Sequence, residues 1–374
     1  MKSISLAFAA LLCLLLGACK IDIEVPTSGS VTTISESMGC AAGEVCSVDV
    51  TDIYFDETFV AEPDEGFVFA GWQKKSRGLC GGNTTPCRLF TSGFAGNEIL
   101  MPFLENPDEV FYLQPTFRST GFSLLGIGHS FFRPFIDDMP NHAARAGIVN
   151  HTQSMVFAGG ANGAPQALWE NPTRQAQIKA ILDTGNVELF GMTYEPTYPT
   201  TEGYENWIDY ALLQNPDTRF FLALPWADQP QTTSAEAYAD FWLTAHSTAW
   251  HAFIDTLRDL YPGVEIYCIP YGQSALELRN LFAAGNLPDV SVLTGEATDA
   301  IFVDAKGHPG DILKDLGRLV WLNAIYAVDL STYPWNPGYS VDLHAIAQEI
   351  MEAHDPAYDA PYHQGLKEHG GRAP

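Results

Sequence analysis

The sequence predicts an α/β protein, in which a three-layer α/β/α domain with a parallel sheet follows a small all-β domain. From residue 119 on, apolar strand-like runs alternate with helix-like segments, which is typical of a sheet covered by helices on both faces. Residues 24–118 instead hold short β-favouring pieces separated by Gly, Asn, Pro and Asp. With 374 residues and 46% hydrophobic content, the chain is long enough for one large domain and one small one.

The first residues have the layout of an export signal. One early lysine precedes an apolar run over residues 4–16, which is too short to span a bilayer stably. The Leu-Gly-Ala-Cys that ends at Cys19 resembles the lipobox of bacterial lipoproteins. This resemblance implies that residues 1–18 are removed, that Cys19 carries a lipid anchor, and, because Lys20 follows, that the anchor lies in the outer membrane. An ordinary secretory signal is the alternative.

The predicted small domain, residues 19–118, holds four cysteines: Cys40, Cys46, Cys80 and Cys87. In an exported small domain, such an even set indicates disulfides, although the sequence does not choose among the three pairings. A zinc site is the alternative, but this segment has no histidine. The pieces "GFVFAGW", "CGG…PC" and "LQPTF" resemble the small β modules of internalin B-repeat type on bacterial surface proteins. Cys268, in an apolar run, is expected to be a buried thiol.

The net charge of −26 excludes one class of partner. A surface this acidic repels phosphates, so we expect no nucleic acid. It also disfavours docking on anionic lipid, which leaves the lipid anchor as the expected contact with a membrane.

Five strand-like runs follow in order within the second domain: "GFSLLGIG" at 121–128, "SMVFAGG" at 154–160, "VELFGMTY" at 187–194, "TRFFLALPW" at 218–226 and "VEIYCIPYG" at 264–272. Helix-like segments separate them. The segment at 171–185 ends in a glycine that suits a C-cap, and the longest, at 234–261, begins with a serine cap. A last strong helix is expected within 309–330, with proline in its first turn.

Polar or glycine-rich blocks stand where ligands collect, at the carboxyl ends of these strands. In chain order they are "GIGHSF", "FAGGANGAPQALW", "GMTYEP" and "FVDAKGHPGD". An early serine, a glycine turn and a late Asp–His pair before the final helix resemble the SGNH (GDSL-like) hydrolases. The resemblance implies a flavodoxin-like fold for residues 119–335, with a C-terminal helix and tail over 336–374.

The same resemblance proposes a catalytic set. Ser130 would be the nucleophile and His308 the base that takes its proton, because a serine hydroxyl is a poor nucleophile by itself. Asp304 would orient the imidazole, although three residues separate it from His308 where the family has two. Asp299 and Asp311 are the alternatives for the acid. The plain structural alternative for Ser130 is a helix N-cap.

The first and second blocks supply the expected oxyanion donors. They are the Ser130 amide and the amide of Gly160 or, as the alternative, Gly159. The family's third block usually supplies an asparagine, and none stands in "FGMTYEP", so Asn162 is the expected substitute. Four aromatic residues near strand ends are expected to line the pocket or to belong to the core: Trp169, Tyr194, Trp226 and Tyr271.

The predicted function is that of an exported serine esterase. The resemblance implies hydrolysis of acyl esters, such as acetyl esters of carbohydrate or esters of lipid, through an acyl-serine intermediate. It implies no cofactor and no metal, and histidine pairs such as His142 with His151 or His344 with His354 lack the company of a metal site. The alternatives are an inactive SGNH-fold carbohydrate-binding or adhesion lipoprotein, and a lipoprotein that acts through its β domain.

Overall fold

The computed structural model describes residues 19–360, so the predicted signal peptide, 1–18, and residues 361–374 lie outside the described part. The chain divides into two compact units, with the boundary between Ser119 and Thr120. Between residues 19 and 360, no helix is both long and apolar enough to cross a membrane.

The first unit is built from three small β-sheets. Its strands form the orders β4-β1-β8, β3-β2-β5-β7 and β6-β9. The bounds are β1 Cys19–Glu24, β2 Gly29–Thr33, β3 Gly39–Cys40, β4 Val45–Val50, β5 Asp56–Pro63, β6 Phe67–Trp72, β7 Cys87–Phe90, β8 Val110–Leu113 and β9 Pro115–Ser119, with a short helix α1 Met101–Glu105. Strands β1 and β2 alternate buried and more exposed residues, as expected of strands that cover a core on one face.

Two disulfide bonds cross-link this unit. Cys40 bonds to Cys46 and Cys80 to Cys87, with Cα–Cα distances of 5.8 and 5.9 Å. The prediction of disulfides is confirmed, and the pairing that the sequence left open is local. Each bridge closes a short loop. This closure lowers the conformational entropy of the unfolded chain and so stabilises the folded unit by about 2 kcal/mol.

The second unit contains a five-stranded parallel sheet in the order β11-β10-β12-β13-β14. The bounds are β10 Ser123–Gly128, β11 Thr152–Phe157, β12 Leu189–Thr193, β13 Arg219–Ala223 and β14 Ile266–Ile269. Counted from β10, this is the order 2-1-3-4-5 of flavodoxin-like folds. The strands are apolar on both faces, and every residue of β12 and β14 is buried. The predicted fold class is confirmed.

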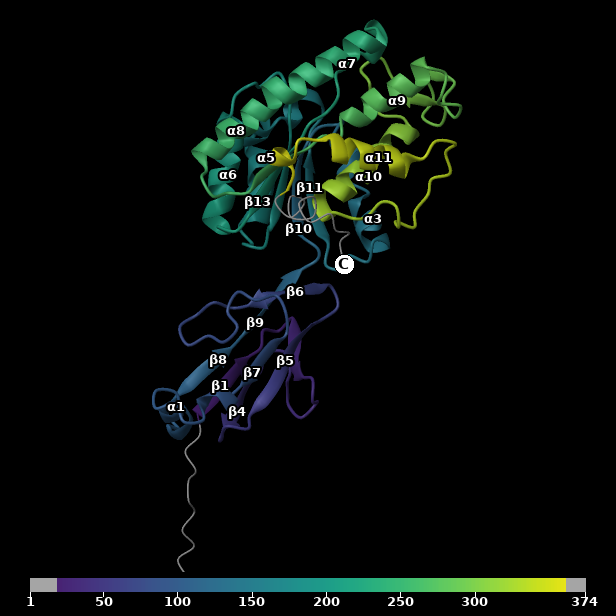
Figure 1. Cartoon of the computed structure of the whole chain (residues 1–374). Helices are drawn as coiled ribbons and strands as arrows, with labels where there is room; N and C mark the ends of the chain where they lie inside the picture. The colour runs from purple at the N-terminus through teal and green to yellow at the C-terminus, as the bar shows by residue number, and fades with distance from the viewer. Residues whose placement is uncertain (1–18, 361–374) are drawn as a thin grey trace, which may run out of the picture. The chain divides into compact units, whose positions relative to one another are not determined.

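Helices cover both faces of this sheet. In Figure 1, β10, β11 and β13 lie between α5, α6 and α8 on one side and α3, α10 and α11 on the other. The bounds are α2 Arg133–Ile136, α3 Met139–Arg145, α4 Pro165–Glu170, α5 Pro172–Leu182, α6 Glu202–Gln214, α7 Ala235–Thr244, α8 His251–Leu260, α9 Gln273–Ala283, α10 Asp311–Tyr326 and α11 Leu343–Ala353. The helix N-cap predicted at Ser234 is present: the Ser234 hydroxyl accepts a hydrogen bond from the backbone N–H of Ala237 at the start of α7.

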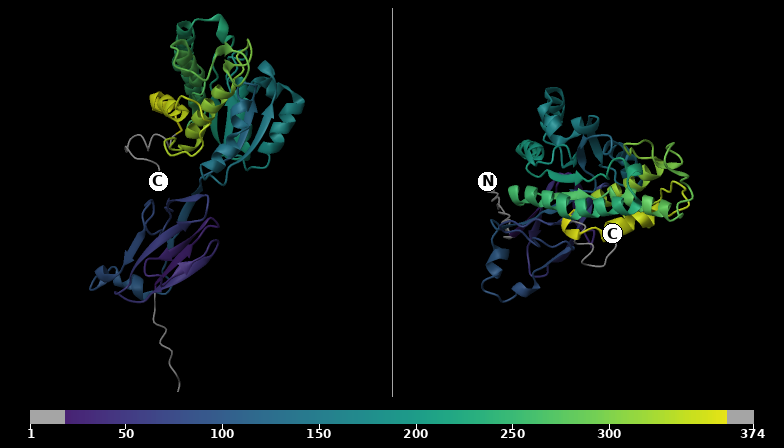
Figure 2. Two further views of the ribbon diagram at one scale, coloured as in Figure 1. Left: turned by 90° about the vertical axis from the view of Figure 1, so that its right-hand side faces the viewer. Right: turned by 90° about the horizontal axis from the view of Figure 1, so that it is seen from above.

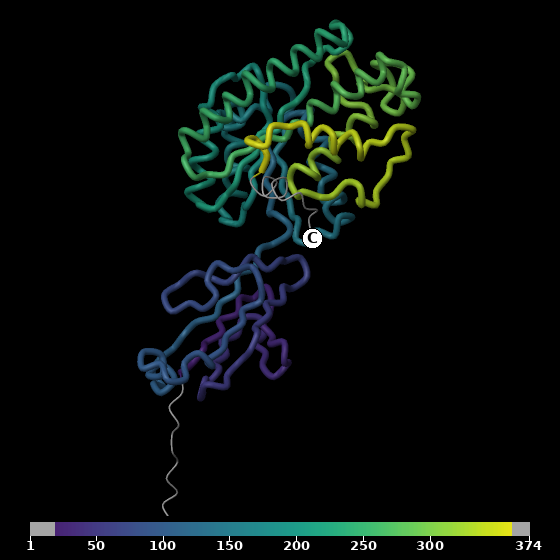
Figure 3. Tube along the Cα trace, in the orientation of Figure 1, coloured from purple at the N-terminus to yellow at the C-terminus, as the bar shows by residue number. Residues whose placement is uncertain are grey.

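The predicted long helix at 234–261 consists of three segments. Helices α7 and α8 are joined by η4, a π-helix over Ala245–Trp250, and together they form one rod, seen from above in the right panel of Figure 2. The Cα trace in Figure 3 runs along this rod in one direction. The π-helical turn is thus an insertion within a continuous helix.

The C-terminal segment packs within the second unit. Helix α11 lies against α10 and α9, and its buried residues join the same hydrophobic core. The two short strands β15 Val292–Thr294 and β16 Ala300–Phe302 pair in parallel just before the loop that carries His308.

Candidate active site

Ser130 stands two residues beyond the end of β10, where the sheet order reverses between β10 and its neighbours β11 and β12. Ligands bind at such a switch point in open α/β sheets. The chain turns sharply here: a Cβ on Gly128 would lie 2.8 Å from the Phe132 ring, so only glycine fits. Ser130 is half-buried and opens onto a pocket.

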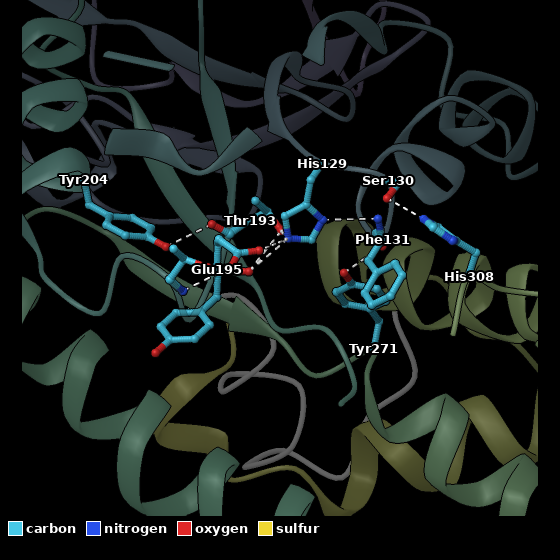
Figure 4. Close-up of polar contacts among 10 residues, drawn as sticks. His129, Ser130, Phe131, Thr193, Glu195, Tyr204, Tyr271 and His308 are labelled. Atoms are coloured by element: carbon cyan, nitrogen blue, oxygen red, sulfur yellow. Dashed lines mark hydrogen bonds and ion pairs between the residues drawn. The ribbon is translucent and has the colours of Figure 1, made fainter. Parts of the chain in front are cut away.

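Ser130, His308 and Asp304 form a chain of hydrogen bonds. The Nδ1–H of His308 donates to Asp304 Oδ2 at 2.6 Å, which leaves Nε2 to accept from Ser130 Oγ at 2.8 Å. Figure 4 shows the Ser130 hydroxyl directed at the His308 ring. The structure therefore brings together the three residues that the sequence assigned to catalysis, in the geometry of a nucleophile, its base and an orienting acid.

The turn from Asp304 to His308 accommodates the additional residue between acid and base. Gly307 adopts φ +98°, a conformation that favours glycine. Its amide and that of His308 donate to Asp304 Oδ1 at 3.0 and 3.1 Å. Partial burial opposes ionisation of Asp304, but these bonds and the one from the imidazole outweigh it, so the pKa of the carboxyl lies below its usual value.

The same turn is fixed from outside. The Trp226 indole N–H donates to Gly307 O at 2.9 Å, and the Gln229 amide donates to Lys306 O at 3.1 Å. The two alternative acids are engaged elsewhere: Asp299 accepts from the Ser291 hydroxyl, and Asp311 pairs with Lys314. Asp304 is thus the acid that the structure gives to His308.

His129, next to the serine, acts as a structural link. Its Nδ1 accepts the Phe131 amide at 3.2 Å, so its Nε2–H donates to Tyr194 O at 3.2 Å, beyond the end of β12. Figure 4 shows the ring pointing toward Thr193 and Glu195, away from Ser130. Burial lowers the pKa of His129, which keeps the ring neutral. With both nitrogens engaged, it is not the base for Ser130.

The predicted oxyanion donors are only partly brought together. Within residues 19–360, no backbone hydrogen bond engages the Ser130 amide. Gly160, at φ +57°, lines the same pocket as Ser130, whereas its alternative Gly159 does not. Asn162 is exposed and lies outside the pocket lining, because the 3₁₀ turn Gly160–Gly163 leaves its side chain in solvent. Asn162 is therefore withdrawn as a donor.

Lys306 brings a cationic side chain to the pocket beside Gly160. It lines the pocket, and a Cβ built on Gly160 would lie 3.8 Å from Lys306 Nζ. No sequence motif pointed to a role for this lysine. Its position between the acid and the base of the predicted pair was the available signal.

The pocket has a volume of about 710 Å³, and aromatic side chains form part of its wall. Two of the four aromatic residues singled out in the sequence, Tyr194 and Trp226, line it together with Tyr238, Phe241 and Trp250. The other two do not. Trp169 packs on Trp207, and Tyr271 is fully buried, with its hydroxyl donating to Phe131 O at 2.8 Å.

No protein-family model and no curated protein sequence matches this chain. A solved DUF4886 family protein from Bacteroides uniformis aligns with 62% of this chain and 95% of its own, at 13% identity and TM-score 0.40. For the periplasmic domain of a Salmonella ser. Paratyphi A lipopolysaccharide acetyltransferase, the shares are 55% and 83%, at 13% identity and TM-score 0.32. A salicylyl-acyltransferase from a tetracycline biosynthetic pathway gives 85% and 80%, at 9% identity and TM-score 0.34. The function is therefore argued from the geometry of the site.

Proposed function

We propose that the second unit is a serine hydrolase that cleaves acyl esters, of SGNH type. The observation that carries this proposal is the hydrogen-bond chain from Ser130 Oγ through His308 to Asp304 at a sheet switch point. A helix-capping serine has no need of an imidazole at 2.8 Å, and the Ser130 hydroxyl caps no helix among the described residues.

The geometry supports a two-step reaction. His308 Nε2 takes the Ser130 proton as Oγ bonds to the acyl carbon, and it then delivers that proton to the leaving alcohol as the ester bond breaks. In the second step His308 activates water, which releases the acid and restores the hydroxyl. Asp304 holds the imidazole in one tautomer and stabilises its charged form.

The negative charge on the carbonyl oxygen needs donors. The Ser130 amide and the Gly160 amide are the two backbone candidates on the pocket wall. We assign the third place to the Lys306 ammonium, which lies beside Gly160. A cation would stabilise the oxyanion where the family uses a neutral amide.

The residues that line the pocket indicate the chemical class of the substrate. Aromatic side chains suit an acyl chain or the apolar face of a sugar, while Glu195 and Asp228 supply acceptors for hydroxyl groups. We therefore expect acyl, and in particular acetyl, esters of carbohydrate or lipid. No cofactor enters the proposed reaction.

We also propose that the enzyme works in the cell envelope, anchored through Cys19. Cys19 begins β1, and its side chain is only 5% exposed. A lipid on Sγ needs solvent or membrane around it, so this first residue would have to leave the strand in the anchored protein.

The second candidate function is an inactive SGNH-fold protein that binds carbohydrate at the cell surface. The absence of the third-block asparagine favours it. It predicts a folded protein that binds sugars in the aromatic pocket without turnover.

Hydrolysis of p-nitrophenyl acetate separates the two functions. We expect turnover by the wild-type protein and by Ser331→Ala, a control at an exposed serine in the turn after α10. Ser130→Ala should abolish it while the circular dichroism spectrum is unchanged. A folded wild-type protein without turnover would favour the binding function.

A further inference from the structure

Four buried side chains, none of which lines the pocket beside Ser130, converge at the edge of the second unit's sheet. They are His246 of η4, His251 at the start of α8, Cys268 of β14 and His354 just after α11. Their potential ligand atoms all lie within 4.8 Å of one another. The exposed fractions are 8% for His246, 6% for His251, 1% for Cys268 and 5% for His354.

The polar atoms of this cluster are short of partners. Within residues 19–360, neither ring nitrogen of His246 has a hydrogen-bond partner, and His251 Nε2 has none. Buried polar groups are normally satisfied, and an exception calls for a water or an ion.

The π-helix explains how two of these residues meet. His246 and His251 are five positions apart, which would leave them about 140° apart around a regular α-helix. The π-helical turn over Ala245–Trp250 has a longer repeat, so it brings positions i and i+5 to the same side. The two rings lie 4.5 Å apart between centroids. Such turns occur frequently at functional sites.

Surrounding contacts orient the rings. The Nδ1–H of His354 donates to the buried carboxylate of Asp359 at 2.6 Å, which leaves Nε2 facing Cys268 Sγ at 3.3 Å. The His251 ring stacks on Tyr358 with centroids 3.6 Å apart and planes 6° apart. A carboxylate behind a histidine is the usual support of a metal ligand, because it fixes the tautomer and raises the ligand's basicity.

We propose that His246, His251, Cys268 and His354 hold a structural zinc ion. One thiolate and three imidazoles form a closed tetrahedral set, with zinc–ligand distances of about 2.0–2.3 Å. These distances place ligand atoms about 3.3–3.6 Å apart, close to the spacing of Cys268 Sγ and His354 Nε2. On binding, the Cys268 thiol proton is released to solvent and Sγ bonds to the metal. Four protein ligands leave no open position for catalysis.

A metal-free core explains less of the arrangement. A Cys268 S–H bond to His354 Nε2 would satisfy that pair alone. It leaves both ring nitrogens of His246 and Nε2 of His251 unpartnered and gives no reason for the π-helical turn. A zinc ion would give the unpartnered nitrogens a partner and would explain the π-helical turn. It would also link the α7–α8 rod, β14 and the segment after α11.

Metal analysis of protein purified from zinc-supplemented cells tests the site. Two variants remove a ligand while keeping an aromatic ring: His246→Phe preserves the packing on Trp242, and His251→Phe the stacking on Tyr358. His151→Phe, at a half-buried histidine outside the cluster, is the control. We expect about one zinc per chain in the wild type and control and at least a fivefold loss in both variants. Wild-type protein without zinc, or variants that keep it, would overturn the proposal.

Cobalt replaces zinc as a probe that does not depend on the folding of a histidine variant. Chelator-treated wild-type protein titrated with Co²⁺ should show tetrahedral cobalt bands and a thiolate-to-cobalt charge-transfer band that saturate at about one equivalent. Cys268→Ser should lose the charge-transfer band. Its absence in the wild type would contradict the proposed ligand set. Both readouts are independent of esterase activity.

Discussion

Ser130 and His308 share one proton, so their removal should not be additive. We predict that Ser130→Ala and His308→Ala each lower kcat by about 10³-fold or more, with the double variant scarcely worse than either. Asp304→Ala should cost about 10²–10⁴-fold, because Asp304 orients the base without touching the substrate. Steady-state kinetics on one ester measures all four variants. Multiplying effects in the double variant would mean that the two residues act separately.

Lys306 tests the proposed third oxyanion donor. Lys306→Met keeps most of the side-chain volume but removes the charge, and we expect a fall in kcat of about 10²-fold with little change in KM. Lys314→Met is the matched control, since Lys314 pairs with Asp311 outside the pocket lining. Equal kcat values for the two variants would remove Lys306 from the mechanism.

At the residue scale, the sequence predicted which three polar residues the structure brings together better than it predicted the residues around them. Ser130, His308 and Asp304 could be predicted because they stand at strand ends in a recognisable order. Asn162 lies outside the pocket lining, because the direction of a side chain in a 3₁₀ turn is set by tertiary packing that a motif does not contain.

Helix α3 carries a buried histidine whose protonation should weaken the fold. His142 is fully buried, its Nδ1 lies 2.8 Å from the Tyr333 hydroxyl, and Asp138, Arg145 and Arg318 lie near it. Burial, more than the two arginines, lowers the pKa of His142 to about 4, against about 6.5 in the unfolded chain. Between these values the unfolded state binds more protons, so stability falls as pH falls from about 6.5 to 4, by about 3 kcal/mol.

Urea unfolding at several pH values measures this effect. His142→Asn should be less stable at pH 7 but should lose less stability on acidification than the wild type. Parallel curves for wild type and His142→Asn would show that another group governs the acid response.

At the element scale, the alternation of apolar and helical segments was enough to predict the sheet, its helices and their order. The resemblance implied a flavodoxin-like fold, but the strand order 2-1-3-4-5 is known from the structure alone, since apolar runs do not say which strands are neighbours. The cluster of His246, His251, Cys268 and His354 was not predicted from the sequence. Its two helical histidines are five residues apart, and only a π-helical turn, which the sequence did not predict, brings that spacing to one side of a helix. Cys268 and His354 belong to elements that are distant in the sequence.

The chain as a whole is proposed to be tethered through Cys19. Cys19→Ala should move the protein from the detergent phase to the aqueous phase and leave it without lipid on mass spectrometry. Cys268→Ala, the other cysteine without a disulfide in the described part, should remain in the detergent phase. Wild-type protein that is already aqueous would favour the ordinary secretory signal.

Labelling with a fluorophosphonate tests the central claim, that Ser130 is a nucleophile activated by His308. We expect one covalent adduct, located by mass spectrometry on Ser130, in the wild type and in Ser331→Ala. We expect none in Ser130→Ala and labelling slowed at least about a hundredfold in His308→Ala. A folded wild-type protein that takes up no probe, or that carries the adduct on another serine, would contradict this claim.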